Sequence, residues 1–151
     1  MFLRIYSAIG AEVTMRPFIC ASLLLTLTAC GSGPAPLAAD FYGLWQNTTD
    51  GTVRVFEFAA SADDADLSGL SDVYRLYMYA EGAAAEQAQR GSFEVAEGDG
   101  WELVTTVTWT PDGTYVGQSF GNPIEKFDDT TLELLRDDGT TRVYTATDAM
   151  P

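Results

Sequence analysis

Short β-prone runs separated by turn signals follow one another along most of the chain, and this pattern limits the fold more than any other feature. No long stretch keeps the apolar period of an amphipathic helix. The runs are rich in Val, Thr and aromatic residues, which is typical of strands. Eight strands are predicted, over residues 42–47, 52–60, 73–80, 91–96, 101–110, 114–120, 130–136 and 140–147.

The segments between these runs indicate how the strands are joined. Asp50-Gly51 and Asp138-Gly139 are strong hairpin signals. Residues 61–72 predict a polar, Asp-rich loop, and residues 81–89 predict either a short helical turn or a loop. The sequence Gly121-Asn122-Pro123 predicts the end of the strand before it.

Sequential antiparallel strands joined by tight turns favour one fold class. Eight of them close best as an up-and-down antiparallel barrel, because closure removes exposed strand edges. A two-sheet β-sandwich is the alternative. A barrel of about eight strands either fills its interior with side chains or holds one small ligand.

The N-terminal part of the chain is predicted to be a secretory signal. Residues 17–29 form an uncharged, mostly apolar run that follows Arg16. The run is shorter than the roughly 20 residues that a membrane-spanning helix needs. A positive start, a short apolar run and small residues at its end are the features of a signal peptide. Either Met1 or Met15 can serve as the start.

The end of this run, Leu27-Thr28-Ala29-Cys30, resembles the lipobox of bacterial lipoproteins. The resemblance implies that Cys30 carries the acyl chains (palmitate among them) and becomes the first mature residue. Gly31 follows where an Asp would hold many such proteins at the inner membrane, so the family rule implies the outer membrane. The alternative is an ordinary secretory leader with a chance cysteine.

These features divide the chain into a signal peptide over residues 1–29, a lipid-anchored tether over 30–39 and one barrel domain over 40–151. The tether is rich in Pro, Gly and small residues, as flexible linkers are. The second cysteine, Cys20, lies in the leader, so the mature chain has no disulfide.

Composition excludes several classes of function. The 151 residues include 8 Lys and Arg, 22 Asp and Glu, and no His, for a formal charge of -14. Removal of Arg4, Glu12 and Arg16 with the leader changes this to -15. So acidic a chain is not expected to bind nucleic acid. Catalysis through Ser-His or Cys-His pairs is also excluded. The sequence therefore predicts a protein that is not an enzyme and is expected to be a monomer.

The first predicted strand carries a second resemblance. Gly43-Leu44-Trp45 resembles the Gly-X-Trp at the start of lipocalin-like barrels, and the late strands around Leu132 and Tyr144 resemble those of small lipocalin-like bacterial lipoproteins. The resemblance implies that Trp45 plugs the closed end of a barrel.

Aromatic side chains are the candidate ligand-binding residues. Trp101 and Trp109 share one face of a predicted strand, and with Trp45 they either line a cavity or form core, the second being favoured. Tyr77 and Tyr79 line a cavity only if their face of the strand points inward. We favour the opposite face, Tyr74 to Met78, because Arg75 then stays in water.

The acidic loop is a candidate calcium site. Asp64, Asp66 and Ser68 have the spacing of the first ligands of a calcium loop, and Asp72 follows at a later ligand position. Arg75 stands where a bidentate Glu is needed, so an EF-hand is not supported. A solvated acidic loop is the favoured interpretation, and no other cofactor is expected.

The sequence thus favours a lipid-anchored envelope protein that contacts the membrane through Cys30. It is expected to bind either a small apolar or amphipathic ligand in the barrel or a partner at the rim. Two alternatives stay open: an acidic inhibitor or interaction module for a basic protein, and a structural envelope protein without a ligand.

Overall fold

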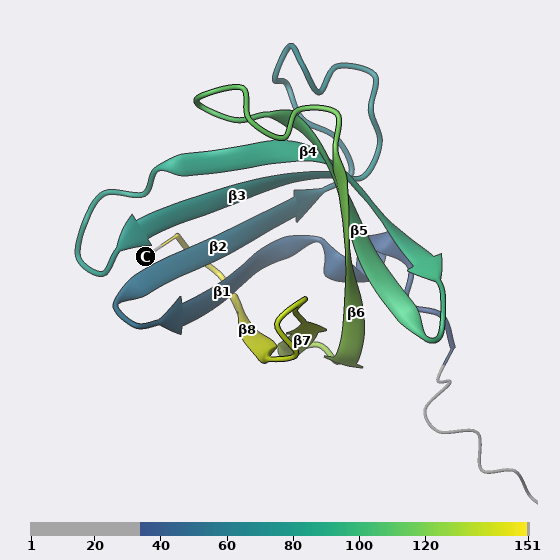
Figure 1. The fold of residues 1–151 in the computed structure, drawn as a ribbon. Helices are drawn as coiled ribbons and strands as arrows, with labels where there is room; N and C mark the ends of the chain where they lie inside the picture. The colour runs from purple at the N-terminus through teal and green to yellow at the C-terminus, as the bar shows by residue number, and fades with distance from the viewer. Residues whose placement is uncertain (1–33, 151) are drawn as a thin grey trace, which may run out of the picture. The chain divides into compact units, whose positions relative to one another are not determined.

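The computed structural model describes residues 34–150 as a closed antiparallel barrel of eight strands in up-and-down order (Figure 1). This confirms the predicted fold class and excludes the two-sheet sandwich. Each strand pairs with the next one along the chain, and the last strand returns to the first. The elements are η1 (Ala38–Phe41), β1 (Gly43–Thr49), β2 (Thr52–Ala59), β3 (Val73–Ala80), β4 (Gln87–Glu97), β5 (Trp101–Trp109), β6 (Ser119–Phe127), β7 (Thr131–Leu135) and β8 (Thr141–Thr147).

The predicted signal peptide, Cys30 and the first part of the tether lie outside the described residues. The short helix η1 starts at Ala38, within the last residues of the predicted tether. The Leu37 N–H donates a hydrogen bond of 2.7 Å to the Asp40 carboxylate, which fixes the start of this turn. Within residues 34–150 there is no helix long and apolar enough to cross a membrane.

The Asp-Gly hairpin signals are confirmed by backbone geometry. Asp50 has φ 51° and Gly51 has φ 70°, as a two-residue hairpin turn with matched twist requires. This turn sets the register that pairs Thr49 with Thr52 and continues along seven residue pairs of β1 and β2. Gly139, at the β7–β8 turn, has φ 77°.

One predicted strand boundary is wrong. The sequence predicts a strand over residues 114–120 that ends at Gly121-Asn122-Pro123, whereas β6 starts at Ser119 and runs through all three residues. Pro123 pairs with Glu102 of β5, but the pairing of β6 with β7 reaches only as far as Ile124. Pro123 therefore lies where β6 has no β7 partner, and its missing N–H interrupts no β6–β7 hydrogen bond. A strand tolerates proline at such an unpaired position.

The β3–β4 connection and β4 also differ from expectation. β4 starts at Gln87, inside the segment for which a helical turn was an alternative. Its ladder with β5 shifts register between Arg90 and Gly91. At Gly91 an added Cβ would lie 1.8 Å from the Thr106 carbonyl oxygen. Glycine is therefore required because the β5 backbone approaches too closely for any side chain.

An aromatic core fills one end of the barrel. Phe41 of η1 is fully buried there, and its ring stacks on Phe127 at 4.3 Å. The Trp45 Nε1–H donates a hydrogen bond of 2.7 Å to the Phe41 carbonyl, so β1 and η1 close this end together. The cluster comprises Phe41, Trp45, Phe58, Tyr74, Phe93, Leu103, Leu132, Leu134 and Tyr144.

The orientation of β3 follows the favoured prediction. Tyr74 is buried in the aromatic core and Leu76 packs against it. The Tyr74 hydroxyl accepts a 2.7 Å hydrogen bond from the Gln89 amide. Because successive side chains of a strand alternate, Arg75 and Tyr77 point to the outer face.

Candidate functional site at the open end of the barrel

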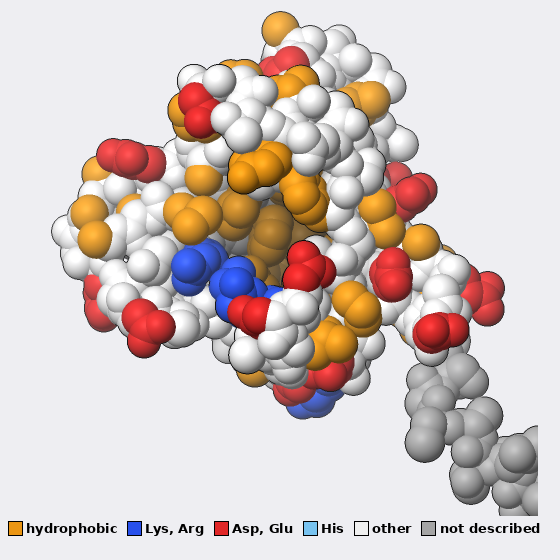
Figure 2. Space-filling model, viewed as in Figure 1, with side chains coloured by type: hydrophobic (Ala, Val, Ile, Leu, Met, Phe, Trp, Pro, Cys, Tyr) orange, Lys and Arg blue, Asp and Glu red, His pale blue; other side chains and the backbone are white. Residues whose placement is uncertain are grey.

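The two ends of the barrel differ. The connection from η1, the acidic loop and the β4–β5 and β6–β7 turns lie at the filled end, whereas the other four hairpin connections surround the opposite end. Figure 2 shows a hollow with hydrophobic side chains at its base and both basic and acidic side chains at its edge. We call the end opposite η1 the open end.

A pocket of about 460 Å³ lies at this end, between the β3–β4 and β5–β6 connections. Leu76 and Met78 from the inner face of β3 and Gln89 of β4 line one part of it. The loop that leads to β6 supplies Thr110, Pro111 and Tyr115 on the other part. Glu86 and Asp112 also line the pocket, so it combines apolar side chains with amide, hydroxyl and carboxylate groups.

Two arginines extend from the inner wall toward the same end. Phe56 and Phe58 of β2 lie in or against the core, so by alternation Arg54 also points inward. The same reasoning places Arg142 on the inner face of β8, two residues before the buried Tyr144. Arg54 is the cross-strand partner of Met78, which lines the pocket.

These arginines act on one another electrostatically. Partial burial lowers the pKa of Arg54, and the neighbouring positive charges of Arg142 and Arg136 lower it further. Tyr144 and Asp50 oppose this change. Burial raises the pKa of the Tyr144 hydroxyl, while the same three guanidinium groups work against that rise. The open end thus places Arg54, Arg136 and Arg142 near enough to affect one another, although the surrounding connections also carry acidic residues such as Asp50 and Asp112.

Arg54 and Arg142 differ from the other basic residues of the described part in their lack of an acidic partner. Of the eight basic residues, Arg4 and Arg16 precede the described part, which leaves six. Four of these form salt bridges with carboxylates, namely Arg75, Arg90, Lys126 and Arg136. Within residues 34–150 no carboxylate lies within salt-bridge distance of Arg54 or Arg142.

The three tryptophans do not surround one cavity. Trp45 fills the closed end, at 4 % exposure. Trp101 lies half-buried and lines a separate pocket of about 170 Å³ with Pro34, Pro36 and Phe127. Trp109 follows the β4–β5 register shift and stacks on the Arg90 guanidinium, whose Cζ lies 4.5 Å from the ring.

Tyr77 and Tyr79 lie away from the interior. They pack with Val53, Val55 and Leu44 in a second cluster, separate from the aromatic core. The Tyr77 hydroxyl donates a 3.1 Å hydrogen bond to Glu57. Burial raises the pKa of both tyrosines. Neither of them lines the pocket at the open end.

The acidic loop binds arginines of its own domain. Asp64 accepts hydrogen bonds from Arg75 at 2.6 Å and from Arg90 at 3.1 Å, so it bridges β3 and β4. Asp66 pairs with Arg90 at 2.7 Å, and this hydrogen bonding lowers the pKa of its carboxyl group.

The four candidate calcium ligands are therefore not brought together. Asp72 accepts a hydrogen bond of 2.6 Å from the Tyr42 hydroxyl, whereas Asp64 and Asp66 bind arginines. Ser68 lies exposed in the loop. Over residues 34–150, no group of three His, Cys, Asp or Glu side chains is arranged to hold a metal ion.

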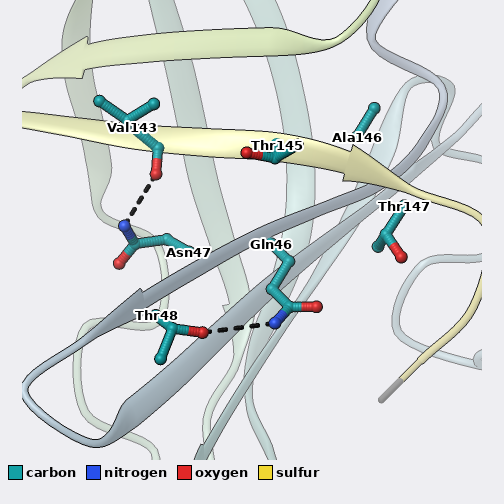
Figure 3. A pocket seen from close by; sticks show the side chains of 7 residues that line it. All are labelled: Gln46, Asn47, Thr48, Val143, Thr145, Ala146 and Thr147. Atoms are coloured by element: carbon teal, nitrogen blue, oxygen red, sulfur yellow. Dashed lines mark hydrogen bonds between the residues drawn. The ribbon is translucent and has the colours of Figure 1, made fainter.

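A further pocket, of about 540 Å³, lies along the β1–β8 seam (Figure 3). The ladder here covers three residue pairs, from Leu44–Thr147 to Gln46–Thr145. Beyond them the Asn47 amide reaches across to donate a 2.8 Å hydrogen bond to the Val143 carbonyl. The lining contains small polar side chains and no charged or aromatic group, so it offers little to hold a ligand.

Sequence reasoning missed the two inward arginines. The signal was present, since Arg54 interrupts the apolar face that carries Phe56 and Phe58, and Arg142 shares a face with Tyr144. A charge on the buried face of a strand is unusual and points to a special environment. No family model, curated protein or solved structure matches the chain.

Proposed function

We propose that the chain is a lipid-anchored binding protein of the bacterial envelope that takes up a small apolar or amphipathic ligand through the open end of its barrel. The observation that carries the proposal is the asymmetry of the interior. Aromatic side chains fill the end at η1, and a pocket of about 460 Å³ lies at the other end. Binding without catalysis also suits a chain that lacks histidine.

The proposed anchor rests on the lipobox-like sequence Leu27-Thr28-Ala29-Cys30 and on Gly31, which favours the outer membrane. The residues that follow are small and rich in Pro and Gly, which suits a tether between the bilayer and η1. Full-length Cys30→Ala should lose the lipid label and its partition with membranes. Retention of both by this variant would refute the anchor.

Ligand uptake is tested on the chain from Gly31 to Pro151. This piece contains η1, the eight strands and the aromatic core of the described residues, so it carries the strand ladders and core contacts described above. Phenylnaphthylamine, a neutral dye whose emission rises in apolar surroundings, should bind saturably at one site. Excitation of the tryptophans should also produce emission from the bound dye through energy transfer.

Two matched variants locate the bound dye. Met78→Trp adds bulk in the pocket at the open end and should abolish saturable binding. Thr48→Trp adds the same side chain to the seam pocket and should leave binding unchanged. Absence of binding to the parent, or equal loss in both folded variants, would refute uptake at the open end.

The acidic surface supports a second candidate, an interaction module for a basic protein. The mature chain would carry a charge of -15, and acidic side chains are spread over the face seen in Figure 2. Such binding is steered by charge and weakens steeply with salt. Cytochrome c, as a basic probe, should then bind Met78→Trp as well as the parent and should be released by salt.

A further inference from the structure

We propose that the ligand at the open end is an anionic amphiphile, whose carboxylate or similar headgroup binds between Arg54 and Arg142 while its apolar part lies on Leu76 and Met78. This inference rests on the proposed uptake of a ligand by the barrel and names its chemical class.

Arg54 and Arg142 come from β2 and β8, the strands on either side of β1. Asn47 of β1 is the cross-strand partner of Arg54 and reaches the Val143 carbonyl beside Arg142, so it spans the interval between them. Both arginines lie on the inner face of the barrel and are half-buried.

Carboxylates of the described residues do not neutralise the charges of Arg54 and Arg142. The described part of the chain holds far more carboxylates than cations, yet these two guanidinium groups remain without an ion pair. The Arg142 side chain does interact with the Tyr144 hydroxyl, and this hydrogen bond opposes the rise in the tyrosine pKa, but the hydroxyl carries no charge that would neutralise the guanidinium. Partial burial and the neighbouring charge of Arg142 both disfavour the Arg54 charge, and an anion between the two guanidinium groups relieves the repulsion.

An apolar surface lies beside the two arginines. Met78, the cross-strand partner of Arg54, lines the pocket together with Leu76. Deeper in the barrel, Phe56 and Tyr144 lie against each other at 5.4 Å between ring centroids. Glu86 and Asp112 line the same pocket from the β3–β4 and β5–β6 connections. A headgroup on the β2 and β8 side instead meets the two guanidinium groups, with apolar groups below, and the planar fork of arginine fits a carboxylate in two-point contact.

The negative charge of the domain does not prevent this binding. At physiological salt, exposed charges more than roughly 8 Å away are largely screened. The two arginines act at contact inside a hollow, where screening is weaker. The headgroup therefore gains a local attraction from the two arginines that distant acidic groups on the surface weaken only partly.

The test compares headgroups on one alkyl chain. Laurate, lauryl alcohol and lauryl trimethylammonium are titrated below their aggregation concentrations against the phenylnaphthylamine complex. Laurate should displace the dye best and the cation worst. In Arg54→Gln and in Arg142→Gln the laurate affinity should fall about tenfold or more, as expected for a lost charge-assisted hydrogen bond.

Lys126→Gln is the matched control, because it removes one positive charge from a side chain that pairs with Asp128 at the filled end. It should leave laurate binding unchanged. Binding of lauryl alcohol to every variant reports that the barrel is folded and should stay within about twofold of the parent, since an alcohol forms no charge-assisted pair.

The outcomes separate this inference from the function on which it rests. Equal affinity of the parent for laurate and lauryl alcohol would overturn the anionic headgroup and leave ligand uptake standing. An equal loss of laurate binding in Lys126→Gln would overturn it as well, since net charge alone would explain the effect. If none of the three amphiphiles displaces the dye and the dye itself does not bind, the proposed uptake fails.

Discussion

Trp45→Phe tests whether the hydrogen bond between Trp45 and η1 holds the filled end together. The Trp45 side chain is 4 % exposed and its Nε1–H lies 2.7 Å from the Phe41 carbonyl oxygen. Phenylalanine keeps a ring at this position but removes the donor. The variant therefore separates the polar contact from most of the aromatic packing.

The expected loss has two parts. A buried carbonyl deprived of its donor costs about 1–3 kcal/mol. The smaller ring also withdraws roughly 40 Å² of apolar surface, about 1 kcal/mol at about 25 cal/mol per Å². The free energy of unfolding should fall by about 2–4 kcal/mol, which for a domain of this size is roughly 4 °C in Tm for each kcal/mol.

Thermal and urea unfolding of the Gly31–Pro151 chain, followed by near-UV circular dichroism, measure this loss. Trp109→Phe is the control, because Trp109 is only half-buried and its stacking on Arg90 survives with a smaller ring. The control should stay within about 1 kcal/mol of the parent. A Tm of Trp45→Phe equal to that of Trp109→Phe would refute the reasoning.

Three further predictions concern stability. Gly91→Ala should lower the free energy of unfolding by about 1–3 kcal/mol or more through overpacking, whereas Gly100→Ala, whose added Cβ meets nothing within 4 Å, should be close to neutral in the same urea assay. Asp64→Asn should lower stability by about 1 kcal/mol at low salt and by less at high salt, because its salt bridges are partly exposed; no difference at low salt would contradict this role. Burial raises the pKa of Tyr74 and Tyr144 above the unfolded value of 10.0, so their contribution is complete below about pH 10 and is lost as the pH rises toward the folded pKa. Tyrosinate absorbance should then appear together with unfolding, and its appearance near pH 10 in a barrel that keeps its native dichroism would contradict the assignment.

The fold could be predicted because local signals agreed with the global structure. Alternation, β-branched residues and the Asp50-Gly51 turn each specify a hairpin without knowledge of distant contacts. Gly121-Asn122-Pro123 misled the prediction because the effect of a proline depends on which neighbour its missing N–H would face. The short reach of β7 decides that, and no local pattern reveals it.

The candidate site was less predictable for a related reason. The spacing of Asp64 and Asp66 matches the order of ligands in a calcium loop. In the folded chain, however, Arg75 and Arg90 bind these carboxylates from neighbouring strands. Trp109 leaves the face predicted for it because a register shift in the β4–β5 ladder redirects the strand. The spacing of residues within one segment does not predict contacts that form only after the sheet closes.

The short seam between β1 and β8 has a consequence for the order of folding. Every other ladder joins strands that are neighbours along the chain, whereas Asn47 meets Val143 across 96 residues. Loop closure over so long a distance is entropically costly and forms slowly. Only three residue pairs of this ladder offset that cost, so it should be the last ladder to form and the first to open. Amide protons of β8 should therefore exchange before those of β2 and β3.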